Sequence, residues 1–127
     1  MRYAKCLRQL TLLTALVFLV TCAAGKDSYR QGEELSQMGN YEGAIAFYKD
    51  ALTQEPNNKK YQEALTRAQQ QAAKKYYQRA KNNWSNAAVK DYQAVSTTMA
   101  YLDKAMAFDS QNPDILELHR QLKAKER

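Results

Sequence analysis

The chain has 127 residues, a formal net charge of +6 and 45% hydrophobic residues, a length that allows one domain of ordinary size. Three of its 19 Lys and Arg residues, Arg2, Lys5 and Arg8, come within the first few positions, so 16 cations remain against 13 acids. A net charge of only +3 beyond that segment, with the cations scattered, argues against a basic nucleic-acid-binding face.

The first 21 residues have the pattern of a secretory signal peptide. The three cations come first, an uncharged stretch over 10–20 (LTLLTALVFLV) follows, and small residues close the segment. A basic start, an apolar core of about 7–15 residues and a small-residue exit are typical of exported proteins. A membrane-spanning helix needs about 20 apolar residues, but charge returns at Lys26. The sequence predicts export, with an uncleaved N-terminal anchor helix as the alternative.

Cys22 stands at the exit of this segment. The other cysteine, Cys6, lies inside it, so the rest of the chain must be held by its core without a disulfide. The residues over 19–22 (LVTC) resemble the bacterial lipobox, whose cysteine is lipidated and becomes the first residue of the mature protein. The resemblance implies a signal peptide over 1–21 and a lipid attached to Cys22.

The two neighbours of this cysteine refine the prediction. Thr21 departs from the Gly, Ala or Ser that lipoproteins usually carry before the cysteine. Ala23 follows in place of Asp, which by the family's sorting habit implies the periplasmic face of the outer membrane, with residues 22–27 as a tether. The alternative is ordinary cleavage after Ala23 or Ala24, which would give a soluble periplasmic or secreted protein.

Beyond the signal, the sequence predicts five helices and no strands. The whole chain has four glycines and two prolines, and it lacks runs of alternating β-branched residues. Apolar residues instead recur at steps of three and four, which is the period of one helix face. The expected helices have their apolar stripes over residues 29–36, 41–52, 61–80, 95–106 and 115–122.

Turn-forming residues separate these stripes. Gly39 suits the left-handed position just past a helix end, and Pro56 stops the second helix because proline lacks an amide proton. Asn57-Asn58 can cap the third helix. Residues 83–90, around Trp84, predict a connecting loop between the third and fourth helices.

A repeat signature runs through residues 25–58. It consists of Gly32, Leu35, Gly39, Tyr41, Ala44, Tyr48, Ala51 and Pro56. These residues resemble one tetratricopeptide repeat, a helix–turn–helix unit of about 34 residues, along its whole length. In such a repeat, small Gly32 and Ala44 would let the two helices approach closely. Tyr48 and Ala51 would pack the second helix against its neighbour.

A second, degenerate copy is predicted downstream. The apolar positions over 95–106 match those over 41–52 at an offset of 54 residues, so the intervening helix should be long or the turn should carry an insertion. Ser110 stands where the first copy has Pro56.

A closing helix completes this organisation. Asn112-Pro113 combines a cap with proline at the first helical position. The resemblance therefore implies an all-α, tetratricopeptide-like array of two repeats over 28–110, with a capping helix over 111–127. Because about three repeats are normally needed for stability, such an array is marginal, dimerises or forms the N-terminal piece of something larger.

No constellation of catalytic residues is evident in the sequence. The single histidine, His119, lies at the edge of the last apolar stripe, where a packing role is expected. The chain has no Cys/His cluster for zinc, no glycine-rich phosphate loop and no plausible serine triad. The pair Glu33-Glu34 does not form a dyad, because adjacent helical side chains diverge. We predict a non-enzymatic protein without metal or cofactor.

Aromatic side chains are the predicted anchors for a partner, because tyrosine is common at protein interfaces. Of the nine tyrosines, those on core stripes are Tyr41, Tyr48, Tyr61 and Tyr76. In tetratricopeptide proteins the first helix of each repeat lines a concave groove, and the resemblance assigns this role to Tyr29, Glu33 and Ser36. Tyr77 and Trp84 are further candidates for partner binding.

The leading hypothesis is a lipoprotein adaptor or scaffold that binds a protein partner in the cell envelope. The resemblance is to tetratricopeptide lipoproteins that pilot secretins or serve pilus and outer-membrane assembly. The alternative is an N-terminal helical subdomain, or an accessory subunit, of a larger secretin-like complex with a purely structural role. Besides protein partners, the expected contacts are the membrane, through Cys22, and a second copy of the chain. Nucleic acid is not expected.

Overall fold

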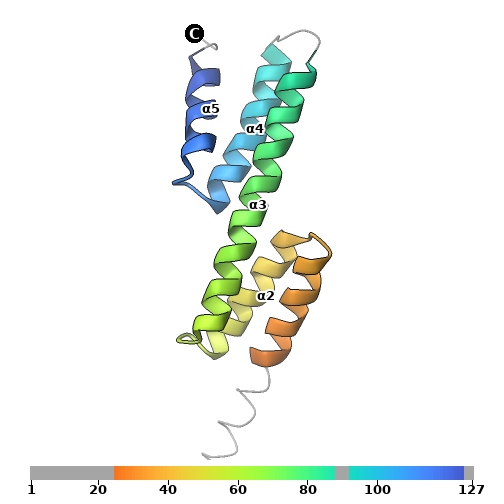
Figure 1. Ribbon diagram of the computed structural model, residues 1–127, viewed down its shortest axis with the longest axis vertical. Helices are drawn as coiled ribbons and strands as arrows, with labels where there is room; N and C mark the ends of the chain where they lie inside the picture. The colour runs from red at the N-terminus through yellow and green to blue at the C-terminus, as the bar shows by residue number, and fades with distance from the viewer. Residues whose placement is uncertain (1–24, 88–91, 125–127) are drawn as a thin grey trace, which may run out of the picture. The chain divides into compact units, whose positions relative to one another are not determined.

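The computed structural model describes residues 25–87 and 92–124, so the predicted signal peptide and Cys22 lie outside the described residues. Within these ranges the protein is all-α, with no strand, as the sequence predicts (Figure 1). Residues 25–37 are helical. They are followed by α2 (Tyr41–Gln54), α3 (Lys59–Asn86), α4 (Tyr92–Phe108) and α5 (Pro113–Lys123). None of the helices in the described ranges is long and apolar enough to cross a membrane.

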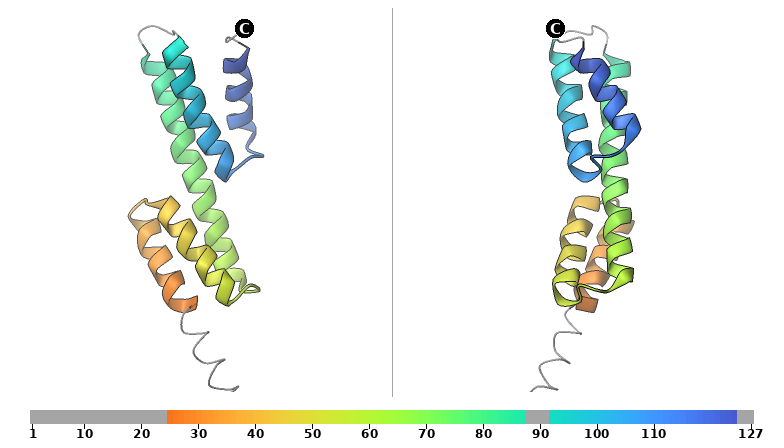
Figure 2. Two further views of the ribbon diagram at one scale, coloured as in Figure 1. Left: turned by 180° about the vertical axis from the view of Figure 1, so that it is seen from behind. Right: turned by 90° about the vertical axis from the view of Figure 1, so that its left-hand side faces the viewer.

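The chain divides after Leu65 into two compact units. The first unit contains residues 25–37, α2 and the beginning of α3, and the second contains the rest of α3 with α4 and α5. In the first unit the helix over 25–37 runs beside α2 (Figures 1 and 2). In the second unit, α4 runs along the unit's part of α3, and α5 runs beside α4 (Figures 1 and 2).

A tight turn joins the two helices of the first unit. Gly39 has a φ of 73°, a left-handed conformation that costs glycine little. Asn40 caps α2, and its side-chain oxygen accepts a hydrogen bond from the amide of Gly43 at 3.1 Å. These boundaries match the prediction from the sequence. The preceding helix includes residues 25–27, the last part of the segment predicted as a tether.

The helix over 25–37 and α2 make their closest approach at Gly32. A Cβ atom built on Gly32 would lie 2.6 Å from Cε1 of Tyr48, so only glycine leaves room for this ring. Ala44 and Tyr48 are 0% and 1% exposed. The hydroxyl of buried Ser28 donates a hydrogen bond to Asp50 of α2. Ring packing and this hydrogen bond together hold the two helices side by side.

The core of the second unit is built by all three of its helices. Its buried members are Ala73, Tyr76, Ala80, Leu102, Ala105, Ile115 and Leu122. The rings of Tyr76 and Phe108 stack with centroids 6.0 Å apart. At the boundary, His119 of α5 lies 3.4 Å from the carboxylate of Asp103 on α4. A hydrophobic core and a boundary contact therefore join α5 to α4.

The buried face of α4 follows the pattern expected from the degenerate copy. Its buried residues are Val95, Thr98, Leu102 and Ala105. The residues at the offset of 54 in α2 are Tyr41, which is half-buried, and Ala44, Tyr48 and Ala51, which are buried. Two helices in different units thus bury corresponding positions.

The third helix is longer than the sequence indicates. We expected a connecting loop from Asn83, but α3 continues to Asn86 and Trp84 is helical. The loop was predicted because asparagine and serine are weak helix formers, and that prediction was wrong. Trp84 falls one turn after Ala80 and packs, half-buried, against the core of the second unit, and packing overrides propensity. Residues 88–90, the end of the predicted loop, lie outside the described residues.

Asparagines begin the third and fifth helices, as predicted. The Asn58 side-chain oxygen accepts a hydrogen bond from the amide of Lys60 at 3.1 Å. Asn112 caps α5 through the amide of Asp114 at 3.2 Å, and Pro113 occupies the start of that helix. Both caps supply an acceptor to amides that have no partner within the helix.

Candidate partner-binding surfaces

Three of the predicted groove residues lie on the helix over 25–37, and Tyr29 is the aromatic one. Its ring stacks on that of Tyr61 with centroids 4.8 Å apart and an angle of 19° between planes. The ammonium group of Lys60 lies 4.6 Å from the centroid of the Tyr29 ring, within range of a cation–π contact. Tyr29 is half-buried, so much of its ring serves the packing of the first unit.

Glu33 and Ser36 meet the hydroxyl of Tyr48. That hydroxyl donates a hydrogen bond to a carboxylate oxygen of Glu33 at 2.6 Å. Burial, and then the Glu33 carboxylate, raise the pKa of Tyr48 above its ordinary value, while Ser36 partly offsets the rise. In the first unit, the predicted groove residues are therefore engaged in holding the helix pair together.

The hydrogen-bonded phenol of Tyr48 should make the stability of the protein depend on pH. Tyr48→Phe should destabilise the protein near pH 7 by about 1.5–3 kcal/mol, because a carboxylate loses its donor. Because the pKa is higher in the folded state, the unfolded chain loses this proton first, and stability should fall as pH rises above about 10. The Phe variant should lack that part of the alkaline loss.

Urea unfolding followed by circular dichroism, at pH about 7 and about 11, measures both effects. Tyr92→Phe is the matched control, because Tyr92 is 81% exposed. Equal alkaline losses in the wild type and the Tyr48→Phe variant would contradict the role given to this phenol.

In the second unit, Tyr77 lines a groove between α3 and the start of α5. The groove has a volume of about 470 Å³. Its lining from α3 is Gln70, Gln71, Lys74, Tyr77, Gln78 and Lys81, and its other edge is Asp109, Asn112, Asp114 and Ile115. The Tyr77 ring is half-buried, and the ammonium group of Lys81 lies 5.6 Å from its centroid. Burial and nearby Asp114 raise the pKa of Tyr77 above its ordinary value. Its phenol is a hydrogen-bond donor at neutral pH.

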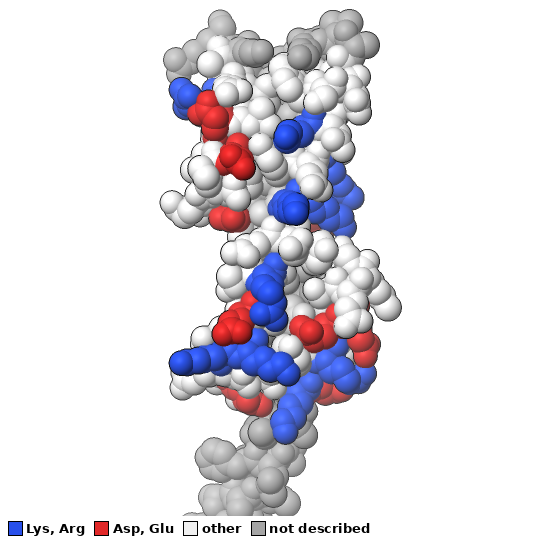
Figure 3. Space-filling view, viewed as in Figure 1, with Lys and Arg blue, Asp and Glu red and all other residues white. Residues whose placement is uncertain are grey.

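The two edges of this groove carry opposite charges. Between Glu63 and Asp91 the chain has no acid, although it has six cations: Arg67, Lys74, Lys75, Arg79, Lys81 and Lys90. Lys74 and Lys81 lie two turns apart on one face of α3, whereas the acids of the groove come from the other edge. In the second unit, Figure 3 shows cations along α3 and acids over α5. The sequence predictions did not include this cationic edge of α3, although the run without acids between Glu63 and Asp91 indicates it.

The predicted groove residues thus fall into two units. Tyr29, Glu33 and Ser36 belong to the first unit, and Tyr77 and Trp84 belong to the second. Within the second unit Tyr77 lines the groove, whereas Trp84 packs against the core.

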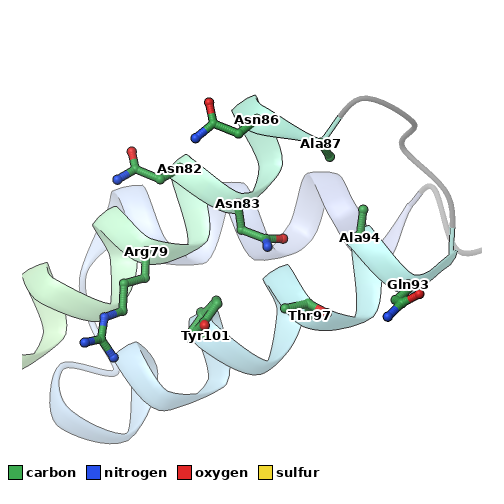
Figure 4. Close-up of a pocket in the computed structure, with 9 residues that line it drawn as sticks. All are labelled: Arg79, Asn82, Asn83, Asn86, Ala87, Gln93, Ala94, Thr97 and Tyr101. Atoms are coloured by element: carbon green, nitrogen blue, oxygen red, sulfur yellow. The ribbon is translucent and has the colours of Figure 1, made fainter.

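A second cleft in this unit lies between α3 and α4, with a volume of about 610 Å³ (Figure 4). It is lined by Arg79, Asn82, Asn83, Asn86, Ala87, Gln93, Ala94, Thr97 and Tyr101. This cleft does not follow from the predicted elements, because two of the asparagines that line it, Asn83 and Asn86, were assigned to a loop. Once α3 continues to Asn86, they form one polar face of that helix.

No protein-family model, curated protein or solved structure matches this chain. In the described ranges, no group of three or more His, Cys, Asp or Glu side chains could hold a metal ion. The chemistry that the two clefts offer is hydrogen bonding, aromatic contact and charge pairing.

Proposed function

We propose that this protein is a non-enzymatic, lipid-anchored adaptor of the cell envelope, and that it binds a partner protein in the groove at Tyr77. The observation that carries the proposal is the make-up of this groove. A half-buried aromatic ring lies among glutamines, with Lys74 and Lys81 on one edge and two aspartates on the other. Such a ring supplies apolar area with a polar tip, which is the usual chemistry of an interface anchor.

The arrangement of the helices supports a binding role. Residues 25–58, which resemble a tetratricopeptide repeat, form a helix pair that meets at Gly32 and Tyr48. The groove of the second unit lies between α3 and α5, which would be the first helix of a repeat and the capping helix after it. By the resemblance, this is the side on which repeats of this kind bind their partners.

The export signal and Cys22 support the location. A Cys22→Ser variant expressed in a bacterium should lose all metabolic labelling by palmitate, because serine lacks the thiol that accepts the lipid. It should also move from the membrane fraction to the soluble fraction, and Cys6→Ser is the matched control. If the wild-type protein were not labelled, the proposed lipid anchor would be wrong, but the proposed binding groove would not be affected.

A pull-down tests the groove itself. The mature protein should recover a partner from envelope extracts, and Tyr77→Ala should weaken that capture about tenfold or more, as expected of an aromatic hot spot. Tyr92→Ala is the control, since Tyr92 is exposed and lies outside the groove. Circular dichroism should show unchanged helix content in both variants. Undiminished capture by the folded Tyr77→Ala variant would contradict the proposal.

A further inference from the structure

We infer that the cleft between α3 and α4 is a second binding site, which holds the backbone of an extended peptide segment and places a carboxylate of that segment at Arg79. This site is distinct from the Tyr77 groove and requires no lipid anchor.

The floor of the cleft consists of two facing pairs of polar side chains. Arg79 and Asn83 point from α3 toward α4, and Thr97 and Tyr101 lie opposite them (Figure 4). Each pair is separated by four residues, which places its members on one helix face, one turn apart. A hydrogen-bonding row therefore lines each side of the cleft.

The spacing of these rows matches an extended chain. Four residues of α-helix rise about 6 Å. In an extended strand, backbone groups that point the same way recur every second residue, at about 6.6–6.8 Å. Successive members of one row can therefore reach alternate residues of a bound segment. A helical ligand would not fit this pattern, because its backbone groups are already paired.

The chemistry of the rows also fits a peptide backbone. A side-chain amide offers donors and an acceptor, as a peptide group does, and threonine and tyrosine hydroxyls also do both. Two further amides of α3, Asn82 and Asn86, also belong to the lining, and their side chains point away from α4 (Figure 4). Recognition by such groups depends on the backbone of the ligand and little on its sequence.

Asn83 is held in position from below. The hydroxyl of buried Thr98 lies 2.9 Å from the side-chain oxygen of Asn83 and 2.7 Å from the carbonyl oxygen of Ala94. When this hydroxyl donates its proton to Asn83, it fixes one end of the amide and leaves the other end toward the cleft (Figure 4). A side chain ordered before binding loses less entropy when a ligand arrives.

The positive charge of Arg79 favours an acidic peptide as the ligand. Among the described residues that line this cleft, Arg79 is the one that carries a charge, and none is a carboxylate. Its guanidinium lies 5.5 Å from the ring centroid of Tyr76, which restrains it near the cleft. A guanidinium can bind a carboxylate with two parallel hydrogen bonds. The bound segment therefore carries Asp, Glu or a C-terminal carboxylate at this end.

A library of displayed heptapeptides, screened against the mature protein, tests the inference. Enriched peptides should be acidic, and synthetic copies should shift the NMR amide signals of residues around 79–83 and 97–101. N-methylation of the central backbone amides, with side chains unchanged, should abolish binding. Replacing the acidic residue by its amide should weaken binding about tenfold, as expected for one charged contact.

The variants separate this cleft from the Tyr77 groove. The Arg79→Gln variant should bind the acidic peptide about tenfold more weakly than the wild type does. It should bind the amide analogue of that peptide with the same affinity as the wild type. Lys74→Gln removes one cation from the other face of α3 and should leave both affinities unchanged. Thr97→Val removes a hydroxyl and keeps the shape of the side chain, so it should lower the affinity for all peptides by a similar factor.

The inference would be overturned if no peptide were enriched, if N-methylated peptides bound fully, or if NMR signals shifted only around Tyr77. A second copy of the chain as occupant would appear instead as dimerisation sensitive to Arg79→Gln, and it would also count against a peptide ligand. Unchanged helix content in each variant shows that the fold is intact.

Discussion

Replacing Gly32 with leucine should destabilise the first unit by about 3 kcal/mol, the upper end of the usual cost of overpacking. A Cβ atom at this position would already lie 2.6 Å from Cε1 and 2.7 Å from Cδ1 of Tyr48. The Tyr48 ring is itself 1% exposed, so it has little room to move away. Helix propensity predicts the opposite sign, because leucine is better than glycine in a helix by about 1 kcal/mol. Urea unfolding followed by circular dichroism therefore decides between packing and propensity.

A double-mutant cycle provides the control. In a Tyr48→Ala background the obstructing ring is gone, and Gly32→Leu should then be neutral or stabilising. If Gly32→Leu stabilises the otherwise unchanged protein, the close approach of the helix over 25–37 to α2 is wrong.

Leu102→Ala should cost the second unit about 2–5 kcal/mol, which is the range for removing a buried leucine side chain. Leu102 is 0% exposed and belongs to the core shared by α3, α4 and α5. The loss combines the apolar area removed from burial with the cavity left behind. Thermal and urea unfolding at neutral pH measure it, with the slope of the urea transition as a check on two-state behaviour.

Leu116→Ala on α5 is the matched control, because the same atoms are removed from a side chain that is 39% exposed. It should cost less than about 1 kcal/mol. A similar cost at both positions would mean that Leu102 does not lie at the centre of a packed core.

Local chemistry determined most of the helix boundaries. Gly39 ends a helix because it accepts a positive φ, and Asn112 begins one because its side chain accepts from backbone amides. These effects act over a few residues and can be read from a single sequence. Apolar spacing likewise identified buried positions such as Tyr48 and Leu102, because the helical period assigns each residue to a face.

The extent of α3 depended on contacts between distant residues. Asn83 and its neighbours are weak helix formers, and the packing of Trp84 against the core of the second unit explains why the helix continues. The apolar periodicity of the sequence extends to Trp84. Periodicity alone does not show whether packing in the core outweighs the weak helix propensity of the surrounding residues.

The candidate sites show the same division. The sequence by itself determined that the chain is all-α. It also predicted an export signal and identified Tyr77 as one candidate for partner binding. Only the tertiary structure decided that Tyr29 and Glu33 are engaged within the first unit, through Tyr61 and Tyr48. It alone also placed Tyr77 in a groove and Arg79 in a cleft. The physical reason is that helix formation and capping are local, whereas a groove exists only where side chains from separate helices meet.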